Sequence, residues 1–124
     1  SNAEVDPAPP SVDLYRARDA SVLIVAVGIV ARAARTAVRL ARERGIRAGL
    51  FRPVTLWPFP ARELREASSR CRSLLVVELN EGQLAEVVTA QAAAGGPVRV
   101  SSLADPAIGM WTPARILQSL EESA

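Results

Sequence analysis

Residues 21–45, SVLIVAVGIVARAARTAVRLARERG, decide the fold of this chain. The run from Ser21 to Val27 is rich in β-branched residues and ends at Gly28, which is typical of a strand buried on both faces inside a parallel sheet. Beyond Gly28 the hydrophobic period becomes helical, with apolar residues on one stripe and arginines on another. The apolar stripe comprises Val30, Ala33, Ala34, Ala37, Val38 and Ala41, and the arginine stripe comprises Arg32, Arg35, Arg39 and Arg42. Because alanines allow close approach, the stretch predicts a strand and a helix packed together, with Gly45 as the C-terminal cap residue.

The same alternation of strand and helix continues on both sides of this unit. Further strands are expected at 12–18, 46–52, 73–79 and 98–102, and further helices at 61–71, 80–94 and 113–121. This alternation predicts an α/β fold, a three-layer α/β/α sandwich around a mostly parallel sheet, with helices on both faces. We expect residues 1–3 to be the remnant of an expression tag, residues 4–11 a proline-rich linker and residues 12–124 a single domain.

The residue types that are missing restrict the chemistry more than those that are present. The 124 residues include no histidine, one cysteine (Cys71) and 15 basic residues that are all arginine. Without histidine no Ser-His-Asp or Cys-His arrangement can form, and one thiol can neither hold an iron–sulfur cluster nor close an internal disulfide. Cys71 lies between Arg70 and Arg72, so both a reactive thiolate and an idle, buried thiol fit the sequence. The composition argues against self-contained catalysis by this chain.

Positive charge is concentrated in the first half of the sequence. Residues 16–72 contain thirteen arginines and four acidic residues, although the net charge of the whole chain is only +2. The arginine stripe is therefore either a set of solvated helix positions or a basic surface for an acidic partner or a phosphorylated ligand. No nucleic-acid partner is expected, because no aromatic residues alternate with the arginines and no nucleic-acid-binding motif is present. The glycines of a dinucleotide-binding turn do not follow Gly28, and the longest apolar run is too short to cross a membrane.

A polar cluster follows the expected strand at 73–79. Glu78 lies at the carboxyl end of this strand, where open α/β sheets place their binding sites, and Asn80, Glu81 and Gln83 come directly after it. One interpretation is a set of side chains that hydrogen-bond a ligand or a neighbouring domain. The other is a capping box, in which Asn80 caps the next helix and Gln83 completes the box beside one satisfied carboxylate.

The segment VTLWPFP, residues 54–60, contains two aromatic residues in a proline-rich setting. Its prolines exclude a central strand, and the last of them suits the first turn of the following helix. A rigid loop that carries Trp57, Pro58 and Phe59 is a suitable interface anchor, because aromatic side chains bury a large apolar area at a low entropic cost. The alternative is that these aromatic residues fold inward and close the edge of the sheet.

Three segments together resemble one known family: VLIVAVG at 22–28, TLWPFP at 55–60 and VVELNEGQL at 76–84. Over residues 20–121 the sequence looks like the C-terminal, transketolase C-terminal-like domain of the α subunit of 2-oxoacid:ferredoxin oxidoreductases, of the 2-oxoglutarate or branched-chain type. The Trp-Pro-Phe-Pro loop and the Glu-x-Asn-x-Gly-Gln segment are the specific parts of the resemblance. Family members usually place Ser or Thr after the strand-end glycine, whereas this chain has Ile29 there.

The resemblance implies a five-stranded mixed sheet, with an antiparallel edge strand at or near residues 12–18. It also implies a parent enzyme that oxidatively decarboxylates a 2-oxoacid to an acyl-CoA and reduces ferredoxin, using thiamine diphosphate, Mg²⁺, iron–sulfur clusters and coenzyme A. In such enzymes other domains hold the diphosphate and Mg²⁺, in agreement with the lack of a Gly-Asp-Gly…Asn motif in this chain. The chain itself is expected to bind none of these cofactors. The expected partners are the other domains of the α subunit, the β subunit and, for the full complex, ferredoxin; the expected location is the cytoplasm.

The resulting hypothesis is a non-catalytic assembly or interface domain without catalytic or metal-binding residues of its own. The interface candidates are Trp57, Pro58, Phe59, Glu78, Asn80 and Gln83. Two alternatives stay open. One is the C-terminal domain of a transketolase or of a dehydrogenase E1 β chain, and the other is a stand-alone α/β module that binds a phosphorylated ligand through the arginine stripe.

Overall fold

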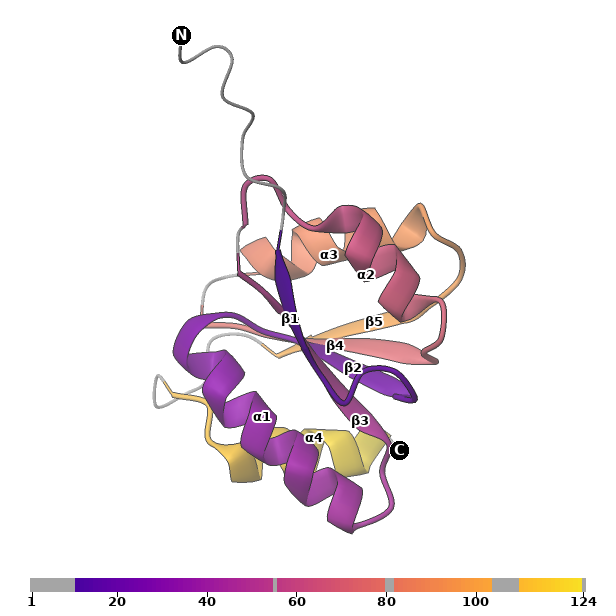
Figure 1. Cartoon of the computed structure of the whole chain (residues 1–124). Helices are drawn as coiled ribbons and strands as arrows, with labels where there is room; N and C mark the ends of the chain where they lie inside the picture. The colour runs from indigo at the N-terminus through magenta and orange to yellow at the C-terminus, as the bar shows by residue number, and fades with distance from the viewer. Residues whose placement is uncertain (1–10, 55, 80–81, 104–109, 124) are drawn as a thin grey trace, which may run out of the picture.

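A computed structural model describes residues 11–54, 56–79, 82–103 and 110–123 of the chain (Figure 1). Strands and helices alternate along the sequence from β2 onward. The elements are β1 (Val12–Tyr15), β2 (Val22–Val25), α1 (Gly28–Glu43), β3 (Ala48–Pro53), α2 (Ala61–Ser68), β4 (Ser73–Val77), α3 (Gln83–Ala93), β5 (Arg99–Leu103) and α4 (Pro113–Ser123). Each helix and strand expected from the sequence is present among these residues, with differences at the ends.

The five strands form one sheet in the order β1-β3-β2-β4-β5. β2 pairs in parallel with β3 and with β4, and β5 pairs in parallel with β4. β1 is antiparallel to β3, with Val12 opposite Pro53 and Tyr15 opposite Leu50. The α/β class and the mostly parallel sheet with one antiparallel edge strand are therefore confirmed. β1 ends at Tyr15, three residues earlier than expected, because Arg16 has a φ of 53° that turns the chain out of the extended conformation.

Two helices cover each face of the sheet: α1 and α4 on one side, α2 and α3 on the other (Figure 1). On the first side, Ile24 of β2 lies in a core cluster with the alanines of α1 and with Ile116 of α4. On the second side, Leu23 of β2 lies in a cluster with Leu64 of α2 and Val88 of α3. Successive side chains of β2 thus enter two different cores, so the strand is buried on both faces, as its composition predicts.

The start of α3 differs from the expected capping box. The helix begins at Gln83, and its N-cap is Gly82, with a φ of 88°, so the prediction that Asn80 is the N-cap is wrong. Asn80 and Glu81 lie outside the described residues. Because glycine has no side chain that could accept a hydrogen bond, the first N–H groups of α3 need an acceptor from elsewhere.

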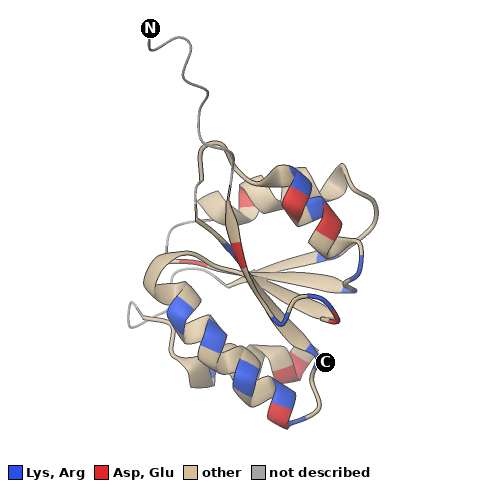
Figure 2. Cartoon of the chain, in the orientation of Figure 1, with Lys and Arg blue, Asp and Glu red and all other residues tan. Residues whose placement is uncertain are grey.

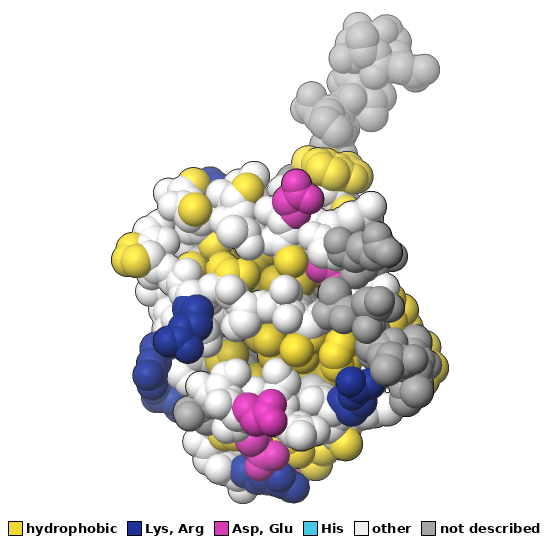
Figure 3. Space-filling model, turned by 180° about the vertical axis from the view of Figure 1, so that it is seen from behind, with side chains coloured by type: hydrophobic (Ala, Val, Ile, Leu, Met, Phe, Trp, Pro, Cys, Tyr) yellow, Lys and Arg dark blue, Asp and Glu magenta, His cyan; other side chains and the backbone are white. Residues whose placement is uncertain are grey.

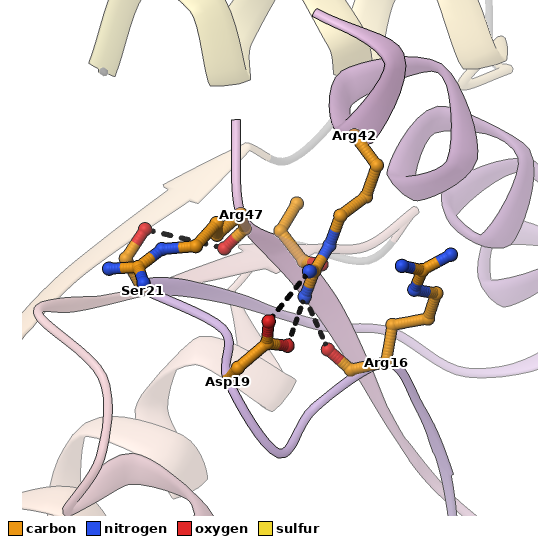
Figure 4. A network of polar contacts seen from close by, with 6 residues as sticks. Arg16, Asp19, Ser21, Arg42 and Arg47 are labelled. Atoms are coloured by element: carbon orange, nitrogen blue, oxygen red, sulfur yellow. Dashed lines mark hydrogen bonds and ion pairs between the residues drawn. The ribbon is translucent and has the colours of Figure 1, made fainter. Parts of the chain in front are cut away.

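Arg42 of α1 anchors the turn between β1 and β2 (Figure 4). Its guanidinium donates hydrogen bonds of 2.8 and 3.1 Å to the Asp19 carboxylate, of 2.8 Å to the carbonyl oxygen of Arg16 and of 2.9 Å to that of Ala48. The hydrogen bond from Arg42 holds the pKa of Asp19 below its ordinary value. The turn also packs closely against β3, since a Cβ added at Gly49 would lie 2.7 Å from the carbonyl oxygen of Arg16. Arg42, with 12% of its side chain exposed, is therefore a structural member of the arginine stripe.

Candidate functional site at the carboxyl edge of the sheet

Most of the candidate residues meet at the edge where the parallel strands end. A cavity of about 800 Å³ lies there between the start of α1, the loop at 54–60 and helix α3. Trp57, Phe59, Glu78 and Gln83 all line it, although they come from distant parts of the sequence. The volume is in the range of ligand-binding pockets, and the position is the one where open α/β sheets place their sites. Pro58 is exposed and joined to Trp57 by a cis peptide bond.

Glu78 is a buried carboxylate that caps helix α3. Only 3% of the residue is exposed. Its Oε1 accepts a hydrogen bond of 2.8 Å from the backbone N–H of Leu84, and its Oε2 accepts one of 2.9 Å from that of Ala85. Its main-chain carbonyl accepts the indole N–H of Trp111 at 2.9 Å. Both carboxylate oxygens therefore serve the N-terminus of α3, where a negative charge also complements the helix dipole.

The two aromatic residues of the loop at 54–60 point in different directions. Phe59 is half-buried and packs against the core cluster under α2 and α3. Trp57 is 81% exposed. The inward packing of the loop thus holds for Phe59, whereas Trp57 is exposed where it lines the cavity.

Trp57 is one of several large apolar side chains exposed at this edge. Others are Ile29, which is 63% exposed at the start of α1, together with Leu56, Leu79 and Met110. Ile29 and Leu79 line the cavity and also an adjoining hollow of about 310 Å³ that reaches Met110. We call these five residues the carboxyl-edge apolar surface. The departure of Ile29 from the family pattern was visible in the sequence, but no local signal separates Leu79 or Met110 from core positions.

The arginine stripe does not act as one surface. Arg42 is held by the contacts described above, and the guanidinium of Arg35 lies 4.0 Å from the ring centroid of Tyr15. Arg32 and Arg39 remain exposed along α1, whose row of basic residues is visible in Figure 2. Because two of the four guanidinium groups are engaged within the chain, the stripe offers a weaker anion site than its spacing suggests.

The thiol of Cys71 contacts the end of the preceding helix α2. The residue is half-buried, and its Sγ lies 3.3 Å from the carbonyl oxygen of Ala67, to which it donates. Burial raises the pKa of the Cys71 thiol, and the charge of Arg70 offsets this only in part. Of the two interpretations left open by the sequence, the idle, buried thiol is therefore the one that fits the structure.

The residues that the structure describes offer little to a metal or a redox cluster. Among them, no three His, Cys, Asp or Glu side chains are grouped so that they could hold a metal ion. An iron–sulfur cluster needs several thiolates, and the chain has one cysteine. A single thiol therefore does not fit the iron–sulfur clusters that the family resemblance implies. In the same residues, no helix has the length and apolar character needed to span a bilayer.

The sheet topology and the two helix layers define a transketolase C-terminal-like domain, and solved structures share this fold. A 2-oxoglutarate:ferredoxin oxidoreductase from Magnetococcus marinus, with 2-oxoglutarate, coenzyme A and succinyl-CoA bound, superposes with a TM-score of 0.75 and 22% identity over 90% of this chain and 19% of that one. A split-gene transketolase, an inactive β4 tetramer, superposes with a TM-score of 0.79 and 18% identity over 96% of this chain and 43% of that one. Residues 20–109 match the family of the pyruvate:ferredoxin oxidoreductase core domain II, and the chain belongs to this family.

Curated relatives come from the same group of enzymes. A 2-oxoglutarate synthase subunit KorA from Methanothermobacter marburgensis is 44% identical over 91 residues, which are 73% of this chain and 23% of that protein. A ketoisovalerate oxidoreductase subunit VorB from Methanothermobacter thermautotrophicus is 48% identical over 73 residues, 58% of this chain and 20% of that protein. The chain thus corresponds to about a fifth of the length of these relatives. The resemblance to a subunit of 2-oxoacid:ferredoxin oxidoreductases is confirmed.

Proposed function

We propose that this chain is a non-catalytic interface domain of a thiamine-diphosphate-dependent 2-oxoacid:ferredoxin oxidoreductase. The whole enzyme would oxidatively decarboxylate a 2-oxoacid to its acyl-CoA and pass the electrons to ferredoxin. The observation that carries the interface role is the carboxyl-edge apolar surface, which surrounds a cavity. The chain corresponds to only about a fifth of the length of its relatives. The proposed occupant of this surface is the remainder of the same α subunit together with the β subunit.

The exposed side chains explain why this edge suits a protein partner. Burying one large apolar side chain contributes about 1.5–3 kcal/mol, so five of them at one edge would contribute substantially to docking. Monomeric proteins rarely expose contiguous apolar patches larger than roughly a few hundred Å², and tryptophan is enriched among the anchor residues of interfaces. Trp57, with 81% of its surface exposed, is the natural anchor of this surface.

The polar groups at the same edge favour packing over chemistry. Glu78 is the buried acid of the cavity, and both of its carboxylate oxygens already accept backbone N–H groups of α3. A general base needs a carboxylate oxygen within reach of a substrate proton. We therefore assign Glu78 the role of shaping the edge of the site, and we assign thiamine diphosphate, Mg²⁺, the iron–sulfur clusters and coenzyme A to other parts of the enzyme.

The test compares Trp57→Ala with Leu14→Ala, in the assembled oxidoreductase and in the isolated chain. Leu14 is also an exposed apolar residue, but it lies on β1 and outside the carboxyl-edge apolar surface. Trp57→Ala should lower the midpoint of thermal unfolding of the assembled enzyme and leave that of the isolated chain unchanged. Leu14→Ala should change neither midpoint. An assembled enzyme that is equally stable with alanine at position 57 would refute the interface.

The non-catalytic part of the proposal has a separate test. Calorimetric titration of thiamine diphosphate with Mg²⁺ into the isolated chain should give no heat of binding. Binding at micromolar concentration would show that the chain contributes a complete cofactor site, and would overturn this division of roles.

A further inference from the structure

A second hollow lies at the opposite edge of the sheet, where the parallel strands begin. Its volume is about 330 Å³, and three arginines line it: Arg47, Arg72 and Arg99. We call them the amino-edge arginines. They immediately precede or begin β3, β4 and β5, so three different strands contribute one basic residue each. On the back of the molecule, arginine side chains gather on the side where these strands begin (Figure 3).

Backbone hydrogen bonds fix the spacing of these three positions. The N–H of Ser21 donates to the carbonyl of Arg47 at 2.7 Å, and the N–H of Arg72 donates to the carbonyl of Ser21 at 2.7 Å. Ser73, the next residue, is the register partner of Arg99. Because neighbouring strands lie about 4.8 Å apart, the three positions span roughly 14 Å along the sheet edge. The row therefore follows the starts of three neighbouring elements of one sheet.

The amino-edge arginines, like Arg39 and unlike Arg42, have no side-chain acceptor among the described residues. Within the described part of the chain, no ion pair or side-chain hydrogen bond engages their guanidinium groups, in contrast to Arg42. The acidic residues that are close in sequence to the lining of the hollow include Glu43, two residues before Gly45, and Glu121 and Glu122 at the end of α4. Glu121 is paired with Arg44 at 2.7 Å, and Glu43 and Glu122 are exposed. The local balance of charge at this edge is therefore positive.

We propose that the amino-edge hollow binds a small anion that carries a linear chain of three or more phosphoryl groups. Guanidinium groups match phosphoryl oxygens with paired hydrogen bonds, and they remain charged at every physiological pH. Three such groups spread over roughly 14 Å suit a chain of phosphoryl groups better than one isolated phosphate. The concave shape favours a small ligand over a flat protein face, and the site is independent of the carboxyl-edge apolar surface.

Inorganic triphosphate is the probe, titrated into the 124-residue chain by calorimetry at low ionic strength. We expect triphosphate to bind at least tenfold more tightly than orthophosphate. Arg47→Gln and Arg72→Gln should each weaken triphosphate binding by about tenfold, the size expected for losing one charged hydrogen-bonding group. Arg72→Lys should retain part of the affinity for triphosphate, because lysine keeps the positive charge but lacks the paired N–H donors of the guanidinium group. Arg39→Gln, which removes an exposed arginine of α1, should stay within twofold of the unchanged chain.

Three results would overturn the proposal. The first is unchanged affinity in both Arg47→Gln and Arg72→Gln. The second is an equal loss in Arg39→Gln, which would show diffuse attraction to a basic protein. The third is tighter binding of a hexaglutamate peptide than of triphosphate, with the same dependence on the amino-edge arginines, which would assign the hollow to an acidic protein segment. Circular dichroism and the unfolding midpoint of each variant establish that it is folded.

Discussion

Replacing Glu78 tests how the carboxyl edge of the sheet is held together. The carboxylate accepts two backbone hydrogen bonds, of 2.8 and 2.9 Å, from the first turn of α3, and it is 3% exposed. A hydrogen bond to a charged group contributes about 1.5–3 kcal/mol. In Glu78→Gln the amide oxygen keeps one of the two bonds, while its NH₂ group faces the other backbone N–H. The expected loss is about 2–3 kcal/mol of the free energy of unfolding.

Glu78→Ala should cost more, because both bonds disappear and the buried N–H groups lose their acceptor. We expect about 3–5 kcal/mol for this variant. For a domain of this size, each kcal/mol corresponds to about 4 °C in the unfolding midpoint, so Glu78→Gln should melt about 10 °C lower.

Urea unfolding followed by circular dichroism measures both variants. The matched control is Glu86→Gln, because Glu86 is an exposed acidic residue in the same first turn of α3. Glu86→Gln should change the free energy of unfolding by no more than about 0.5 kcal/mol. A loss below about 1 kcal/mol in Glu78→Gln, or an equal loss in the control, would refute the role of Glu78 as the cap of α3.

The remaining predictions concern the turn between β1 and β2 and the thiol of Cys71. Gly49→Ala should lower the free energy of unfolding by about 1–3 kcal/mol in calorimetry, since its Cβ would lie 2.7 Å from the carbonyl oxygen of Arg16; an unchanged midpoint would contradict this contact. Arg42→Lys should cost about 1–2 kcal/mol in urea unfolding and Arg39→Lys nothing, because an ammonium group cannot reproduce the fork of bonds that Arg42 makes. Burial raises the pKa of Cys71 above 9.0, so the neutral thiol contributes stability that is present below pH 9.0 and lost as the pH rises through the folded-state pKa. Cys71→Ala should therefore flatten the alkaline fall in stability, and iodoacetamide should modify the folded thiol more slowly than the unfolded one.

The sheet could be predicted from the sequence because its signals are local. The apolar run at β2 and the helical stripe of α1 each depend on the spacing of neighbouring residues, and burial in both cores follows from that spacing. The end of β1 could not be predicted, because Arg16 carries no local signal for its φ of 53°. That turn is held by bonds from Arg42, which is distant in the sequence.

The candidate site was predicted in part. Trp57 and Glu78 stood out because their residue types are unusual at a loop and at a strand end. The sequence predicts Asn80, the nearest good capping residue, as the cap of α3, whereas the acceptor is Glu78 and the N-cap is Gly82. Hydrogen bonds that cross from a strand end to a helix start depend on the tertiary fold, and so does the exposure of Met110. Neither these hydrogen bonds nor the exposure of Met110 can be predicted from the spacing of residues in the sequence.

Hydroxyl-radical footprinting of the isolated chain and of the assembled oxidoreductase tests the interface most directly. The method reports the exposure of individual side chains, and it is sensitive to tryptophan and methionine. Trp57 and Met110 are exposed in this chain, whereas Trp111 is buried and serves as the internal reference. The account predicts strong oxidation of Trp57 and Met110 in the isolated chain and their protection in the assembled enzyme. Equal oxidation of both residues in the two samples would contradict it.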